Sequence, residues 1–298
     1  MLIFNMKKFI RKSILFSVYF ILFFIFVNSA FLLIIALTDW DFVKRLESLR
    51  FDNPDYDLLV LGTSLAEYGV DTEMLTSEGI ISYNLALVGS SNKTSYIQLK
   101  EYLSSYSKRP KYVLLALNSH LEQFDQEGIQ PVVEFTMKNQ KIDLSDVPIS
   151  KFNWAGMELL KKALYKQYRH TQISYGQKQS IKVVPDNTDF QNLDLNLHKY
   201  ESAIWIGKMA ELCDDNGILL VIVDIPGVEE TQNNSNIGPF KIHYENGYSA
   251  ELYNFSCHDF CKFIQSDKDW GGMSHLNKYG AEKFTHELID IIFRRQYP

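Results

Sequence analysis

Residues 57–64 read DLLVLGTS, and this stretch decides the fold class of the chain. A short apolar run that ends at a glycine is typical of a strand buried on both faces of a sheet. Similar runs occur at residues 81–87 (ISYNLAL), 111–117 (KYVLLAL) and 218–225 (ILLVIVDI). Helical patterns separate these runs and follow them, at residues 92–106, 194–216 and 278–295. Strands that alternate with helices predict an α/β domain whose parallel sheet is covered on both faces.

Two polar segments interrupt this alternation. Residues 119–190 are rich in Lys, Gln and Asn and contain three prolines. We interpret them as an insertion, a lid or a partner surface, with a helix over residues 154–169. Residues 228–247 predict a second polar loop, and residues 40–56 predict a short amphipathic helix before the first strand.

The first 40 residues carry much of the apolar content. Residues 14–37 (ILFSVYFILFFIFVNSAFLLIIAL) contain no charged side chain. As a helix they extend roughly 36 Å, enough to cross a hydrocarbon core of about 30 Å. Lys7, Lys8, Arg11 and Lys12 precede them, which places residues 1–13 in the cytoplasm. The sequence therefore predicts a single-pass anchor at 14–37 and an extracytoplasmic domain at 41–298, periplasmic or extracellular.

Two other readings of the apolar segment stay open. A cleaved signal peptide would use Val27-Asn28-Ser29 as its cleavage site, although signal h-regions are usually about 7–15 residues long. A buried core helix is the other alternative, but such helices seldom run this long without a charge.

Composition excludes several functional classes. The chain has 298 residues, 30 Lys+Arg and 36 Asp+Glu, giving a net charge of −6. Binding a nucleic acid needs a basic face, which this balance argues against. Three cysteines without a CxxC pair indicate neither a disulfide framework nor a zinc ribbon, so we expect no metal and no cofactor. A local disulfide between Cys257 and Cys261 stays open on an oxidising membrane face.

Polar residues or glycine follow each of the first three predicted strands. Ser64 comes after the first, Gly89 after the second and Asn118 after the third, while His275 precedes the terminal helix. Taken singly, each is an ordinary helix cap or turn residue. The carboxyl ends of parallel strands meet at one edge of a sheet, where α/β folds bind their ligands. A histidine at that edge could accept the proton of the Ser64 hydroxyl as a general base.

The order Ser, Gly, Asn and then His-Leu-Asn-x-x-Gly-Ala resembles the SGNH (GDSL-type) hydrolase superfamily. The resemblance covers residues 57–120 and 218–293, and the stretch HLNKYGAEKF carries most of it. It implies a three-layer α/β/α, flavodoxin-like fold. It also implies Ser64 as nucleophile and His275 as base, with an oxyanion hole made by the Ser64 and Gly89 backbone N–H groups and the Asn118 side chain.

One position departs from the family pattern. The family usually has Asp three residues before the His, where this chain has Gly272. Asp269 or Asp267 would orient the imidazole if the intervening loop bulges. Otherwise the site is a Ser-His dyad, or a binding-only descendant.

Anchored members of this superfamily often modify envelope polysaccharides, sometimes beside a membrane-bound O-acyltransferase. The resemblance therefore implies a serine esterase or O-acetyltransferase that acts on acyl esters of bacterial surface glycans through an acyl-enzyme. Two alternatives remain: a lipid esterase with an apolar pocket, and a non-catalytic glycan-binding accessory protein of a polysaccharide assembly complex.

Overall fold

The computed structural model describes residues 2–38, 55–130, 133, 161, 172–181, 183, 191–193, 195–226, 230–232, 236–257, 263–264, 268–272 and 275–294. The chain divides into two compact units. One comprises residues 1–47 and 131–169, and the other residues 48–130 and 170–298.

The first unit contains one long apolar helix, α1 (Leu2–Thr38). Its candidate membrane span, Met6–Val27, has a mean hydropathy of 2.0 and none of it is buried. Among the described residues it is the one helix long and apolar enough to cross a membrane, and a signal sequence passes the same test. The predicted span at 14–37 falls within α1. The helices predicted at 40–56 and 154–169 lie, but for residues 55, 56 and 161, outside the described residues.

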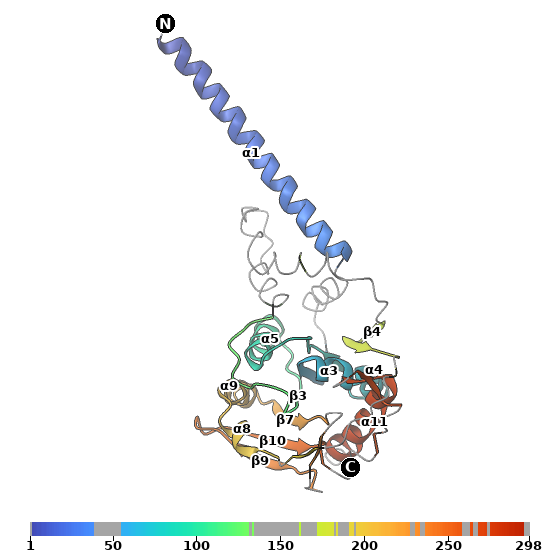
Figure 1. Ribbon diagram of the computed structural model, residues 1–298. Coiled ribbons are helices and arrows are strands. Elements are labelled where there is room, and N and C mark those ends of the chain that lie inside the picture. The colour runs from blue at the N-terminus through green and yellow to red at the C-terminus, as the bar shows by residue number, and fades with distance from the viewer. Residues whose placement is uncertain are drawn as a thin grey trace. The chain divides into compact units, whose positions relative to one another are not determined.

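The second unit is built on a six-stranded, mostly parallel sheet with the order β2-β1-β3-β7-β10-β9 (Figure 1). Its strands are β1 (Leu58–Gly62), β2 (Ser82–Asn84), β3 (Tyr112–Leu117), β7 (Leu219–Asp224), β9 (Phe240–His243) and β10 (Ser249–Asn254). Only β9 is antiparallel to its neighbour, β10. The prediction of an α/β fold with a parallel sheet is confirmed, and the four predicted strands correspond to β1, β2, β3 and β7.

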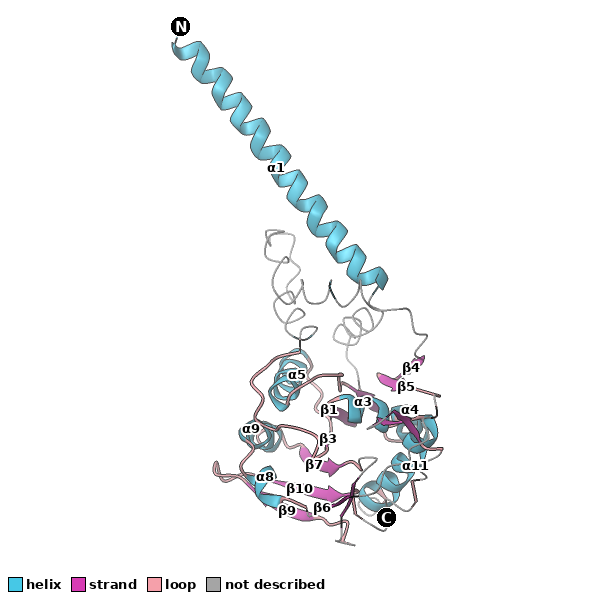
Figure 2. Cartoon of the chain, viewed as in Figure 1, coloured by secondary structure: helices cyan, strands magenta, loops and turns pink. Residues whose placement is uncertain are grey.

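Helices cover both faces of this sheet (Figure 2). They are α3 (Ser64–Gly69), α4 (Thr72–Ser77), α5 (Asn92–Ser105), α8 (Leu197–Glu201), α9 (Ile204–Asp214) and α11 (Lys278–Leu288), which continues into a π-helical turn, η2 (Ile289–Phe293). Successive strand residues point to opposite faces, so Leu58 packs toward α3 and α11 while Leu59 packs toward α5 and α9. Both leucines are fully buried, and each contributes about 1.5–3 kcal/mol of burial free energy.

The helix predicted at 194–216 is divided into α8 and α9, a correction to the sequence analysis. Asn196 caps α8, and Ser202 ends it by donating its backbone N–H to His198. Because of the break, α8 buries Tyr200 completely, and the Tyr200 hydroxyl donates a hydrogen bond to Asp224 Oδ2 at 2.8 Å. The apolar face of α9 packs separately on the sheet.

The segment 228–247 is not only a loop. It contains β8 (Glu230–Gln232), which pairs with β6 (Gln191–Leu193), and the edge strand β9. The adjacent β10, also absent from the sequence analysis, completes the sheet. Its pattern Ser-Ala-Glu-Leu-Tyr-Asn is polar at alternate positions, so it lacks the continuous apolar run that marks the other strands.

The last part of the predicted 119–190 insertion belongs to the sheet unit. The hairpin β4 (Gln172–Ser174) and β5 (Gln177–Gln179) lies against β2, where Tyr175 O accepts the Asn84 N–H at 3.0 Å. Ser180 O accepts the Lys278 N–H at 2.8 Å, which joins the hairpin to α11.

Candidate active site

Ser64 lies where β1 turns sharply into α3. Gly62 makes this turn with φ +137°, and a Cβ there would lie 2.3 Å from the Ala116 carbonyl oxygen of β3. A glycine is therefore required by both backbone conformation and space. Thr63 caps α3, so Ser64 is the first helical residue, half-buried at the carboxyl edge of the sheet.

His275 reaches the same edge from a short hairpin of β11 (Trp270–Gly272) and β12 (His275–Leu276). Asn277 fixes the hairpin to α11, because its side chain caps the helix and its N–H donates to Asp269 O at 2.9 Å. A Cβ on Gly280 would lie 2.2 Å from the same carbonyl oxygen. These contacts explain physically why the stretch HLNKYG holds a histidine in a defined place.

The two side chains meet at hydrogen-bond distance, with His275 Nε2 2.7 Å from Ser64 Oγ. The Tyr68 ring lies edge-on to the imidazole, with ring centroids 5.2 Å apart. Burial lowers the pKa of His275 below its ordinary value. The imidazole is therefore neutral at pH 7, the form that can accept the Ser64 proton.

Gly89 contributes backbone to the same pocket as Ser64. Its loop is held by buried Glu67, whose Oε2 accepts the Val88 N–H at 2.9 Å. Among the described residues, no group accepts a hydrogen bond from the backbone N–H of Ser64 or Gly89. Both N–H groups are thus available to a ligand oxygen, which is the chemical requirement of an oxyanion hole.

Asn118 is not placed as the sequence analysis expects. Its side chain is fully buried and is not among the residues that line the pocket. Nδ2 donates to Ile225 O at 2.8 Å, and Oδ1 accepts the His120 and Leu121 N–H groups at 2.9 and 2.8 Å. These contacts join the ends of β3 and β7 and cap the turn after β3.

The carboxylate of Asp269 lies against Lys283 of α11, with Oδ2 2.7 Å from Nζ. Asp267 lies outside the described residues. Gly272 is the cross-strand neighbour of His275, and a Cβ there would lie 4.0 Å from His275 Nδ1. The position beside the second imidazole nitrogen is therefore occupied by a residue without a side chain.

A pocket of about 350 Å³ opens beside Ser64. Its lining is mostly polar and consists of Thr63, Ser64, Leu65, Gly89, Ser90, Ser91, Asn92, Leu121, Glu122, Gln123 and Gln126. Glu122 is the ionisable residue of this wall that the sequence analysis missed. Thr63 Oγ1 donates to Glu122 Oε1, yet burial dominates and raises the pKa of Glu122 to about 7. Its signal in the sequence was only an acid four residues after the strand-end Asn118.

A buried polar cluster lies behind the site at the end of β7. Asp224 is fully buried, and burial raises the pKa of its carboxyl. Its oxygens accept hydrogen bonds from Ser119, Tyr200 and Ser256 at 2.8, 2.8 and 3.1 Å. These bonds join β3, α8 and the end of β10 to β7.

Within the described ranges, no three His, Cys, Asp or Glu side chains are grouped to hold a metal ion. Cys257 is buried, and Cys261 lies outside the described residues, so the disulfide between them stays an open alternative. Comparison with protein-family models and with curated proteins gives no match to this chain.

Proposed function

We propose that this chain is a membrane-anchored serine esterase or O-acyltransferase of SGNH type, acting on acyl esters, such as acetyl esters, of bacterial cell-surface glycans. The observation that carries the proposal is the 2.7 Å contact between His275 Nε2 and Ser64 Oγ, a residue that lines a pocket. A neutral imidazole at this distance can take the hydroxyl proton as Ser64 attacks an ester carbonyl. The Ser64 and Gly89 N–H groups would stabilise the resulting oxyanion.

The order of the strands supports the finer fold assignment within this proposal. Numbered along the chain, the five parallel strands β1, β2, β3, β7 and β10 lie in the order 2-1-3-4-5. That is the flavodoxin-like order, in which ligands bind at the carboxyl ends of the strands.

The lining of the pocket favours a glycan over a lipid. Eight of its residues have polar side chains, whereas an acyl chain needs a predominantly apolar channel. The apolar helix α1 supports anchoring beside a membrane, where surface glycans and an O-acyltransferase partner would be within reach.

A second candidate is a non-catalytic glycan-binding accessory protein. It is favoured by one observation, the glycine at position 272, where the SGNH pattern usually has Asp three residues before the His. In the Ser-His-Asp template, loss of the orienting carboxylate slows the reaction about 10⁴-fold.

The test is release of p-nitrophenol from p-nitrophenyl acetate by the full-length chain in detergent. Ser64→Ala and His275→Ala should each abolish Ser64-dependent release while the circular-dichroism spectrum stays that of the wild type. A fluorophosphonate probe should label the wild type and not Ser64→Ala. Wild-type activity in either variant contradicts the site, and a folded wild type with neither activity nor labelling favours the accessory protein.

A further inference from the structure

One wall of the pocket is the segment that follows β3, residues 118–130, which we call the pocket segment. Its first turn brings Leu121, Glu122 and Gln123 to the cavity. Two contacts at its start hold Glu122 in place: its backbone N–H donates to Asn118 O at 3.1 Å, and Lys199 Nζ donates to Glu122 O at 2.6 Å.

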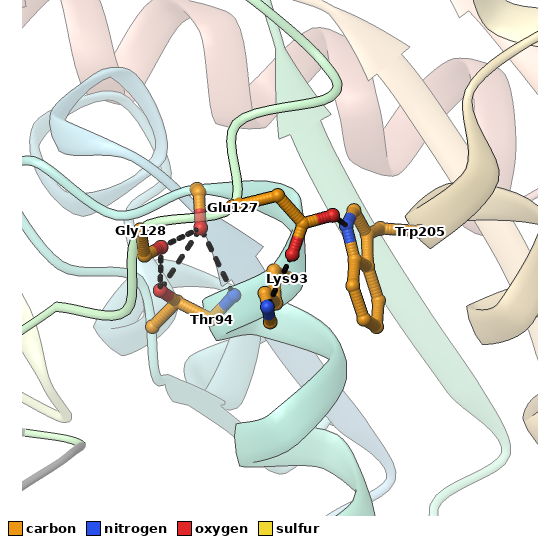
Figure 3. A network of polar contacts seen from close by, with 6 residues as sticks. Lys93, Thr94, Glu127, Gly128 and Trp205 are labelled. Carbon is orange, nitrogen blue, oxygen red and sulfur yellow. Dashed lines mark hydrogen bonds and ion pairs between the residues drawn. The ribbon is translucent and has the colours of Figure 1, made fainter.

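The rest of the pocket segment is fastened to the first turn of α5. Asn92 Nδ2 donates to Phe124 O at 3.1 Å, and Ser91 Oγ donates to Gly128 O at 2.5 Å. Figure 3 shows the outer end of this attachment, where Glu127 pairs with Lys93 and accepts the Trp205 Nε1–H at 3.2 Å. The bonds from Lys199, Asn92 and Ser91 therefore fix the wall that carries Glu122 before any ligand arrives, which lowers the cost of binding. The exposed ion pair of Glu127 with Lys93 contributes little to this attachment.

Glu122 has spare capacity to bind a ligand. A carboxylate offers about four acceptor positions, and the Thr63 hydroxyl occupies one of them. The neighbouring wall adds the amides of Asn92, Gln123 and Gln126. Ser90, also in the wall, has a buried hydroxyl with no hydrogen-bond partner among the described residues. A ligand hydroxyl or a water is the natural partner for such a group, since a buried hydroxyl left unpaired is destabilising.

We infer that this pocket is the acceptor subsite of the transfer reaction, and that it binds a hydroxyl-rich, uncharged sugar through hydrogen bonds from the sugar hydroxyls to Glu122. The inference rests on the proposed function and deepens it, because it names the acceptor class and the residue that selects it. Carboxylates select polyols over simple alcohols because they accept two hydroxyl protons in one geometry.

The chemical step balances without a further reactant. After the first half-reaction Ser64 Oγ carries the acyl group, and the leaving alcohol has gone. A hydroxyl of the bound sugar attacks the acyl carbon while His275 Nε2 takes its proton. The bond between the acyl carbon and Ser64 Oγ then breaks, the imidazolium returns the proton to Oγ, and the sugar ester leaves.

The experiment compares Glu122→Gln with the matched control Glu127→Gln in the full-length chain in detergent. Gln at position 122 keeps the volume and an oxygen for Thr63 but replaces one acceptor oxygen with a donor. Glu127 belongs to the same segment, its side chain is 68% exposed, and it does not line the pocket. Each protein is given p-nitrophenyl acetate alone, with a panel of methyl glycosides, or with n-butanol, and acetylated products are measured by mass spectrometry.

The expected result is selective. At pH 8, where the Glu122 carboxyl with its pKa of about 7 is mostly ionised, transfer to the preferred glycoside falls by about tenfold or more in Glu122→Gln, the size expected for losing a charge-assisted hydrogen bond. Release of p-nitrophenol without acceptor and transfer to n-butanol stay at the wild-type level, and Glu127→Gln behaves as the wild type throughout. Unchanged glycoside transfer in Glu122→Gln overturns the inference. An equal loss of transfer to n-butanol also overturns the inference. Glu122 would then affect the position of Ser64 through its hydrogen bond with the neighbouring Thr63, and not the binding of the sugar.

A binding measurement separates this inference from the proposed function. Saturation-transfer NMR with the same glycosides needs no turnover. Binding that Glu122→Gln removes and Glu127→Gln keeps, in a protein without esterase activity, supports the subsite and contradicts the enzyme. Esterase activity that depends on Ser64 but no binding of or transfer to any glycoside supports the enzyme and overturns the subsite.

Discussion

At the scale of single residues, the site is defined by what lies on each side of the His275 ring. Nε2 contacts Ser64, the Tyr68 ring lies against the imidazole, and Gly272 is the residue across the hairpin. The nearby acid Asp269 pairs with Lys283 and braces α11. Ser64 and His275 are therefore in hydrogen-bond contact, and Gly272 places no side chain beside the ring.

Replacing Gly272 with Asp tests this reading. A Cβ at Gly272 is 4.0 Å from Nδ1, so the carboxylate of an Asp can reach the ring and fix its orientation. We expect Gly272→Asp to move the acid limb of kcat/KM for p-nitrophenyl acetate to higher pH, because a carboxylate beside Nδ1 stabilises the imidazolium. Gly272→Asn is the matched control, since its side chain has nearly the same size and no charge. A shift that occurs equally in both variants, or in neither, contradicts the placement of Gly272 beside the ring.

The proposed esterase activity should depend on pH because His275 is buried. The base is active when neutral, and burial lowers its pKa below 6.5, so the acid limb of kcat/KM should have its midpoint below pH 6.5. Activity should rise with pH through that limb and level off above it. A midpoint at or above pH 7 in a full pH–rate profile would show that a carboxylate holds the imidazolium in place.

At the scale of elements, sharp turns with glycine bring the chemistry to the sheet edge. β1 and β3 approach so closely at Gly62 that the turn into α3 admits no side chain. Asn277 caps α11, and Gly280 lets this helix approach the backbone of Asp269 closely, so the β11–β12 hairpin is held against α11. Both polar residues of the pair are thus positioned by rigid backbone, which favours a preorganised site.

Gly62→Ala should lower the free energy of unfolding by about 2–4 kcal/mol, because it adds both a clash with the Ala116 oxygen and an unfavourable φ. Gly79→Ala is the matched control. Gly79 has φ +91° but no atom within 4 Å of its Cβ, so only the backbone term of about 1 kcal/mol applies. Thermal unfolding by circular dichroism measures both. Equal shifts for the two variants would mean that the strands can move apart at Gly62.

At the scale of the whole molecule, α1 decides whether the chain would stay at a membrane. Its apolar stretch is long enough for a membrane span and also fits a signal sequence. The apolar run continues to residue 37, longer than a signal h-region, so we expect the chain to keep its N-terminus.

Fractionation of cells that express the full chain tests this expectation. The protein should stay in the membrane pellet after a carbonate wash, and N-terminal sequencing should find residues 1–13 still attached. Recovery of a soluble protein that begins near residue 30 would identify a cleaved signal peptide and move the domain away from the membrane surface.

The sequence by itself determined the strands that are buried on both faces. Leu58–Gly62, Tyr112–Leu117 and Leu219–Asp224 are continuous apolar runs, because each residue meets a helix on one face or the other. It also placed Ser64 and His275 at the ends of elements that share one edge. The half-polar strands β9 and β10 and the break between α8 and α9 carried no such local pattern.

Only the tertiary structure decided which side chains face the pocket. Asn118 and Glu122 both follow β3, yet the first is used to join β3 to β7 and the second reaches the cavity beside Thr63. Asp269 is close to His275 in sequence, but its carboxylate pairs with Lys283. Lys283 lies in α11, 14 residues further along the chain. Such choices depend on contacts between residues far apart in the chain, because burial and hydrogen-bond partners are properties of the packed structure and not of local sequence.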